Sequence, residues 1–130
     1  MDIEMELSQI IIRETTDEQV IVLKEKYGDR SFPIVIGTME AVSIDRRLKG
    51  FIPPRPLTHD LVYNILAELD VQLERIVIND LRDHTFFARL CLKKDGRVIE
   101  VDSRPSDAIA LGVANETPIF AAEHVLEAIG

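Results

Sequence analysis

The chain has little that would tie it to a membrane or to an oxidising compartment. Its only cysteine is Cys91, so no disulfide can form within it, and this cysteine content is typical of a reducing compartment. No apolar run approaches the length of a membrane span, and the acidic, alternating start MDIEMELSQIII differs from the basic beginning of a signal peptide. These absences predict a cytoplasmic protein with no membrane partner.

Positive charge is also scarce. Fifteen Lys and Arg residues stand against 23 Asp and Glu, which gives a formal net charge of −8. Because contacts to phosphate need local cations, this balance disfavours broad, charge-driven binding of nucleic acid and leaves only a local basic pocket open. The densest basic cluster, DRRLKG at 45–50, is interpreted as a solvated helix end whose cations complement the negative pole of the helix.

Familiar catalytic and metal-binding signatures are absent as well. The chain contains no Gly-rich phosphate loop, no GxSxG, no HExxH and no Cys/His cluster with zinc spacing. The pairs Asp80/Asp83 and Asp102/Asp107 could hold a hard divalent cation, but such spacings are common by chance. No linker divides the 130 residues, which suit one domain, 1–130, with one core.

Short alternating and apolar runs predict a sheet. The first strand alternates strictly within 1–14, and Met5 and Leu7 on its apolar face make it the expected sheet edge. The turn signals LRDH and Asp95-Gly96 join the middle strands into an antiparallel meander. Further strands are expected at 19–26, 31–37, 71–80, 85–94, 97–102 and 117–121.

A change of period marks the helices. Met39, Val42 and Leu48 fall on one side of a helix that Gly50 would end. Further helices are expected at 58–69, 105–115 and 123–130. The prediction is a compact α+β domain, mostly an antiparallel sheet with three to four short helices. A faint echo, Pro33-Ile34 with Pro118-Ile119 and Arg55-Pro56 with Arg104-Pro105, suggests an internal duplication.

Two short segments carry the polar side chains that could form a site: RPLTHD at 55–60 and DSRPSD at 102–107. In each, an Arg-Pro pair precedes a helix whose first N–H groups attract anions, and we expect the two pairs to lie close together. His59 could transfer a proton near neutral pH, and guanidinium groups suit phosphate. The candidates are Arg55, Thr58, Arg104 and Ser106 for substrate binding, and His59, Asp60, Asp102 and Asp107 for catalysis.

Each candidate also has a structural interpretation. Thr58 and Ser106 could cap their helices, because short hydroxyl side chains are common N-caps. Asp60 and Asp107 could complement the helix dipoles. The arginines of the two segments could simply pair with these same carboxylates. Sequence alone leaves both interpretations open.

Four stretches, in this order, resemble the bifunctional nuclease domain family: PIVIGTMEA at 33–41, RPLTHDLVYNIL at 55–66, DHTFFARL at 83–90 and VDSRPSDAIALGVANETPIF at 101–120. The resemblance covers nearly the whole chain. It departs at Val35, where members often carry a tryptophan. The resemblance implies a compact α+β domain, often a homo-oligomer, and a family named for plant members credited with cleaving RNA and DNA.

Two functions follow as hypotheses. The first is a nuclease acting on RNA or DNA, in which Asp60, Asp102 or Asp107 would hold a divalent cation such as magnesium or manganese. The second is a non-enzymatic oligomeric module that binds a small anion or a protein. A homo-oligomer, most simply a dimer, is expected for either.

Overall fold

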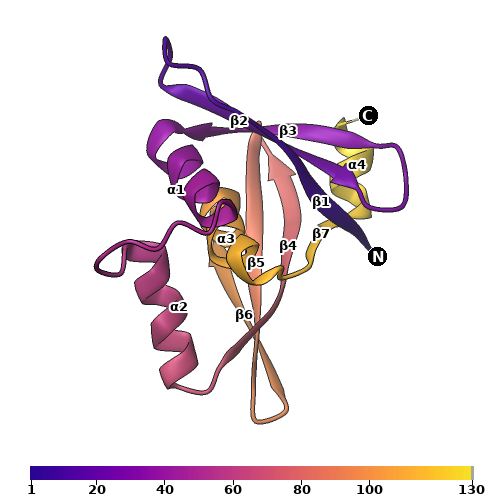
Figure 1. Ribbon diagram of the computed structural model, residues 1–130. Helices are drawn as coiled ribbons and strands as arrows, with labels where there is room; N and C mark the ends of the chain where they lie inside the picture. The colour runs from indigo at the N-terminus through magenta and orange to yellow at the C-terminus, as the bar shows by residue number, and fades with distance from the viewer. Residues whose placement is uncertain (130) are drawn as a thin grey trace.

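A computed structural model describes residues 1–129, and it shows one seven-stranded sheet with helices packed against it (Figure 1). The elements are, in chain order, β1 (Asp2–Ile11), β2 (Glu18–Glu25), β3 (Ser31–Gly37), α1 (Thr38–Leu48), α2 (Thr58–Glu68), β4 (Gln72–Arg82), β5 (Thr85–Lys94), β6 (Arg97–Ser103), α3 (Pro105–Gly112), a 3-10 turn (Val113–Asn115), β7 (Ile119–Ala122) and α4 (Glu123–Ile129). None of the helices in residues 1–129 has both the length and the apolar character needed to cross a bilayer.

The strand order is β3-β2-β1-β7-β4-β5-β6, and every neighbouring pair is antiparallel except β4 and β7. This confirms the α+β prediction. The expectation that the first strand is an edge was wrong, because β1 lies between β2 and β7. Alternation in a sequence shows which face of a strand is buried, but it carries no information about the strand's neighbours.

A three-stranded meander followed by a helix occurs twice in the chain. The first copy is β1-β2-β3-α1 and the second is β4-β5-β6-α3, with antiparallel pairing inside each meander. This order of elements is consistent with an internal duplication. The repeated dipeptides do not match this repeated order of elements. Pro118-Ile119 leads into β7, whereas the strand of the second copy that corresponds to β3 is β6.

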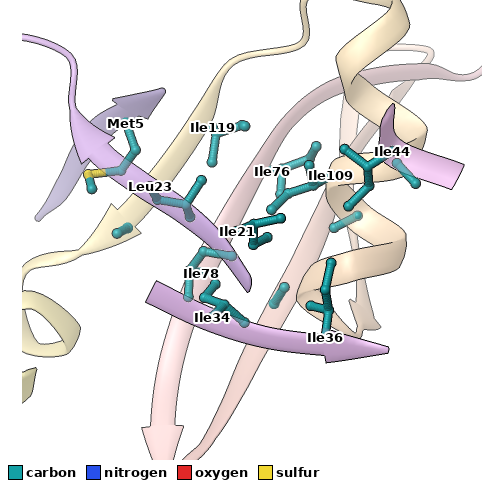
Figure 2. Close-up of a cluster of buried hydrophobic side chains, with 14 of the residues drawn as sticks. Met5, Ile21, Leu23, Ile34, Ile36, Ile44, Ile76, Ile78, Ile109 and Ile119 are labelled. Carbon is teal, nitrogen blue, oxygen red and sulfur yellow. The ribbon is translucent and has the colours of Figure 1, made fainter. Parts of the chain in front are cut away.

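The core lies between the sheet and the helices α1 and α3 (Figure 2). Alternate residues of β2 and β3 point into it, as the period-two pattern requires. Ile109 of α3 is fully buried and lies near Ile76 of β4 and Ile44 of α1 (Figure 2). Almost all of α3 is buried, which explains its run of small and apolar residues. The start of α3 is thereby held firmly against the sheet.

The predicted apolar side of α1 was wrong. Met39 is 77% exposed and Leu48 is 50% exposed, whereas Ala41 and Ile44 are fully buried. The buried stripe is therefore narrow and consists of Ala41 and Ile44. A second side of α1 is polar and faces α2 and α3, as described below.

Two hairpin turns use left-handed backbone. Asp95-Gly96 forms the predicted turn between β5 and β6, with positive φ at both residues. The turn between β4 and β5 is shorter than LRDH, because β4 continues to Arg82 and only Asp83 and His84 remain, at φ 48° and 64°. His84 of the second turn lines the same groove as the start of α3.

The predicted N-caps were displaced by one or two residues. Leu57, not Thr58, is the N-cap of α2, and Asp60 Oδ2 accepts a hydrogen bond from the Leu57 N–H at 3.0 Å. Arg104 is the N-cap of α3 and Pro105 is its first helical residue, so Ser106 lies inside the helix. Thr58 and Ser106 are thus not caps, while Asp60 does serve the start of its helix.

Candidate functional site

The two Arg-Pro segments meet through one hydrogen bond. His59, in the first turn of α2, and Asp107, in the first turn of α3, place Nε2 and Oδ1 2.9 Å apart. The segments therefore meet at these two side chains, whereas the expectation was that the Arg-Pro pairs themselves lie close together. Within residues 1–129, Arg55 is exposed and its side chain makes no hydrogen bond or ion pair with Arg104's carboxylate partners or any other group.

Ser43 of α1 occupies the other nitrogen of the His59 ring. Its Oγ lies 2.9 Å from Nδ1. A carboxylate can only accept, so the Nε2–H of a neutral His59 donates to Asp107 and Nδ1 accepts from the Ser43 hydroxyl. The three side chains form a relay, Ser43 to His59 to Asp107, with one defined tautomer.

Arg104 holds the carboxylate at the end of this relay. Its Nε lies 2.8 Å from Asp107 Oδ2 and a terminal nitrogen lies 3.1 Å from Oδ1, while the other terminal nitrogen is 3.4 Å from Glu40. Partial burial alone would raise the pKa of the Asp107 carboxyl, but the hydrogen bonds from Arg104 and His59 outweigh burial and lower it. Asp107 is therefore an anion at neutral pH.

Arg47 was misinterpreted as part of a solvated helix end. Only 12% of its side chain is exposed, and its guanidinium bonds the Asp60 carboxylate together with the Ala110 and Leu111 carbonyls. Asp60 and these carbonyls belong to α2 and to the end of α3. Arg47 therefore joins three helices through one planar group, which a lysine could not reproduce.

The polar side of α1 explains how these contacts arise together. Glu40, Ser43 and Arg47 are spaced three and four residues apart, so they lie along one face of the helix. Glu40 contacts Arg104, Ser43 contacts His59 and Arg47 contacts Asp60. The spacing was visible in the sequence, but it competed with the apolar pattern in the same helix. Sequence reasoning missed Glu40, Ser43 and Arg47 for that reason.

The remaining candidates lie outside this cluster. Thr58 is exposed at the start of α2. Asp102 is exposed on β6, where its backbone pairs with Arg89, and it has no side-chain contact with Asp107. Ser106 of α3 is buried, with 5% of its surface exposed. The structure therefore brings His59, Asp107 and Arg104 together and links Asp60 to α1 through Arg47, whereas Ser106, Asp102, Thr58 and Arg55 lie outside these contacts.

Two hollows adjoin the cluster. A cavity of about 10 Å³ beside Ser43 and His59 has room for no more than one water molecule. A groove of about 550 Å³, the α3 groove, runs from the edge of β3 past the β4–β5 turn to Arg104 and Ser106. A larger hollow of about 730 Å³ lies between the end of α2 and the β5–β6 turn, and none of the predicted site residues lines it. Of the two hollows, the small cavity borders the relay itself, and the α3 groove borders Arg104, which holds the relay's carboxylate.

No group of three or more His, Cys, Asp or Glu side chains within residues 1–129 is arranged to hold a metal ion. Asp80 is engaged by Arg82 and His124 rather than by Asp83. In each pair suggested by sequence spacing, one carboxylate is engaged by arginine and histidine: Asp80 by Arg82 and His124, and Asp107 by Arg104 and His59.

Removing Arg47 should destabilise the protein strongly. We expect Arg47→Ala to lower the free energy of unfolding by about 3–5 kcal/mol, because it leaves Asp60 and two carbonyls without their buried partner. The neighbouring Arg46→Ala is the control. Arg46 is exposed and lies over the Phe51 ring, so its loss should cost about 1 kcal/mol or less. Urea unfolding measures the free energy of unfolding of both variants. Equal losses of stability would contradict the role of Arg47 in joining the three helices.

The free energy of unfolding should depend on pH through the contacts of the Asp107 carboxylate. Its pKa is lower in the folded chain than in the unfolded chain, so its contribution is fully present well above about pH 4 and disappears as the pH falls towards the folded value. We expect Asp107→Asn to be about 1 kcal/mol less stable than wild type at pH 7, and the gap to close between about pH 5 and pH 2. Asp29→Asn, on the exposed β2–β3 turn, is the control. A gap that stays constant with pH would refute this assignment.

Comparisons with known proteins agree with the sequence motifs. A family model described as the bifunctional nuclease domain matches residues 21–130. Two relatives, "Uncharacterized protein MT1877" and "Uncharacterized protein Rv1829" from two strains of Mycobacterium tuberculosis, are each 38% identical over 127 residues, covering 98% of this chain and 76% of theirs. A rice protein, "Bifunctional nuclease 2" of Oryza sativa subsp. japonica, is 28% identical over 112 residues, which is 83% of this chain and 34% of the rice protein.

The family model extends over most of the chain, and it includes both Arg-Pro segments and the polar face of α1. The predicted resemblance is thereby confirmed. The chain belongs to the bifunctional nuclease domain family.

Proposed function

We propose that the protein hydrolyses phosphodiester bonds of nucleic acid at the cluster formed by His59, Asp107 and Arg104. The observation that carries the proposal is the contact between His59 and Asp107, which unites an imidazole, a carboxylate and a guanidinium from distant segments beside an open groove. Family membership and the name of the rice relative support the same reaction class.

Arg104 would hold the phosphate. A guanidinium has five N–H donors, and the contacts to Asp107 and Glu40 use three of them. The side chain is 63% exposed, so its remaining donors can reach a ligand. The start of α3 adds backbone N–H groups that no side chain caps. Together these donors would offset charge that develops on phosphate in the transition state.

The His59–Asp107 pair would handle the proton. Water attacks phosphorus to form a new P–O bond, the bond to the leaving oxygen breaks, and the water proton passes to the pair before it is returned to that oxygen. Asp107 is the outward member, because it is 33% exposed while both His59 nitrogens are bonded. Ser43 is a positioning residue, since its hydroxyl bonds Nδ1 of His59 and thereby holds the ring, while the Asp107 carboxylate sets the tautomer.

Matched variants test this reaction. We expect His59→Gln and Asp107→Asn to remain folded and to cleave RNA and single-stranded DNA at least tenfold more slowly than wild type, because loss of an acid–base group typically costs about a hundredfold or more. His124→Gln, an exposed histidine on α4, is the control. All proteins are purified identically and assayed with magnesium, with manganese and with a chelator. Equal cleavage by every variant would reject the proposed site.

A second candidate function, an oligomeric binding module, is favoured by the free edge of β6. Among residues 1–129 this strand pairs only with β5, and Val98, Ile99 and Val101 are 62%, 38% and 41% exposed. The other sheet edge, β3, contains Pro33, which cannot donate to a further strand, but β6 has no such protection. We propose that a second copy of this chain covers β6.

Self-pairing of β6 is compatible with its charges. In an antiparallel register centred on Ile99, each Ile99 faces its own copy, Val98 faces Glu100 and Arg97 faces Val101, so no like charges are opposed. A twofold interface of this kind uses the same strand in both copies. The net charge of −8 on each chain acts against it, so added salt should strengthen the dimer.

Light scattering tests the interface. Wild type at tens of micromolar should have twice the chain mass of 14.7 kDa, and Ile99→Lys should have the single-chain mass. Ile52→Lys is the control, because Ile52 is 88% exposed and far along the chain from β6. A wild-type monomer, or a dimer that survives Ile99→Lys, would eliminate this interface.

A further inference from the structure

An apolar stripe runs along the outer side of α2. It consists of Leu57, Leu61, Ile65 and Leu69, which are spaced four residues apart from the N-cap of the helix to its C-cap. Each of these side chains is about half exposed, and α2 stands at one side of the molecule (Figure 1). Residues four apart lie on one face of a helix, so these four side chains form one continuous surface, the α2 stripe.

The exposed side of α2 lacks the charged residues that a helix usually presents to water. Its inner side packs on the core through Val62, Tyr63 and Leu66. The exposed residues from 57 to 67 are all uncharged: Leu57, Thr58, Leu61, Asn64, Ile65 and Ala67. A surface helix normally carries charged and polar residues opposite its buried side. Exposed apolar surface without charge is typical of the centre of a protein–protein interface.

Opposite charges flank the two ends of the α2 stripe. Arg55 lies just before the helix, Glu68 and Asp70 lie at its other end, and all three side chains are exposed. None of the three takes part in an ion pair with another of residues 1–129. A second α2 laid antiparallel on the first would bring opposite charges together at both ends. A parallel arrangement would oppose like charges, which is unfavourable.

The equal spacing also makes the α2 stripe complementary to itself. In a twofold antiparallel arrangement, Leu57 lies over Leu69 of the second copy, and Leu61 lies over Ile65 of the second copy. Rows of residues four apart pack with the two helices crossed at about −50°, the commonest angle in globular proteins. A lipid surface fits less well, because anionic headgroups would repel a chain of net charge −8.

We propose that the α2 stripe is a docking surface for α2 of a second copy of this chain, packed antiparallel, with Arg55 facing Glu68 and Asp70 of that copy at both ends. The contact is separate from the β6 edge and does not depend on the nuclease. It also gives a role to Arg55, which lies outside the catalytic cluster. One helix from each copy buries less than the roughly 800 Å² per partner of a standard interface, so this contact should form only at high concentration.

Cysteine cross-linking tests the antiparallel arrangement without altering the α2 stripe. Thr58→Cys and Glu68→Cys are each prepared in the Ile99→Lys background, in which β6 should not pair, and the native Cys91 is buried. Position 58 would lie opposite position 68 of the second copy. The two copies of position 58 would be about 15 Å apart, ten residues at 1.5 Å each, which is too far for a disulfide. We expect the oxidised mixture to contain at least fivefold more covalent dimer than either variant alone.

Charge variants test the pairing at the ends of the stripe. Light scattering of Ile99→Lys from about 20 to about 500 µM should show the mass rising from that of one chain towards that of two, as for a weak interface. Adding Arg55→Glu or Ile65→Gln should weaken this association at least fivefold. Arg13→Glu is the matched control, because it makes the same change of charge at an exposed residue between β1 and β2.

The outcomes decide whether a second copy occupies the stripe. Cross-links that form mainly in the mixture, together with an effect of Arg55→Glu that Arg13→Glu does not reproduce, would support the proposal. Equal cross-linking by Thr58→Cys alone would overturn the antiparallel arrangement, and equal effects of the two arginine variants would overturn the end contacts. A single-chain mass at every concentration without mixed cross-links would overturn the proposal and leave the stripe to a different protein.

Discussion

The arrangement of the three site helices depends on the buried guanidinium of Arg47. An arginine that is only 12% exposed must have its charge and its donors satisfied, and Asp60 with two α3 carbonyls does so. These partners come from the start of α2 and the end of α3, which are about fifty residues apart in the chain. Satisfying one side chain therefore sets the relative position of α1, α2 and α3.

The relay at His59 follows from the same arrangement. Ser43 lies one helical turn before Arg47, so a helix positioned by Arg47 also brings Ser43 to His59. Arg104 and Glu40 then secure the carboxylate on the other side of the ring. Each group in the cluster has a partner that orients it, as acid–base chemistry requires. The exposed side chain of Arg104 also lines the α3 groove and so connects the cluster to that groove.

The two sheet edges serve different purposes in the proposed functions. β3 borders the α3 groove, and its Pro33 contributes both an apolar wall and protection against pairing. β6 contains no proline and carries three half-exposed apolar side chains between its charged residues. The proposed catalytic residues Arg104 and Asp107 follow directly after β6, so the proposed dimer would lie close to the proposed catalytic cluster.

The sequence by itself determined the strands, the helices, the meander from β4 to β6 and the family, because periodicity, turn residues and ordered motifs are local properties of the chain. It also located the two Arg-Pro segments. Only the tertiary structure decided that β1 is central, that Arg47 is buried, that Glu40 and Ser43 belong to the cluster and that Asp102 does not. These outcomes depend on which elements become neighbours. Pairing between distant segments is set by the combined packing of the whole core, and no local pattern encodes it.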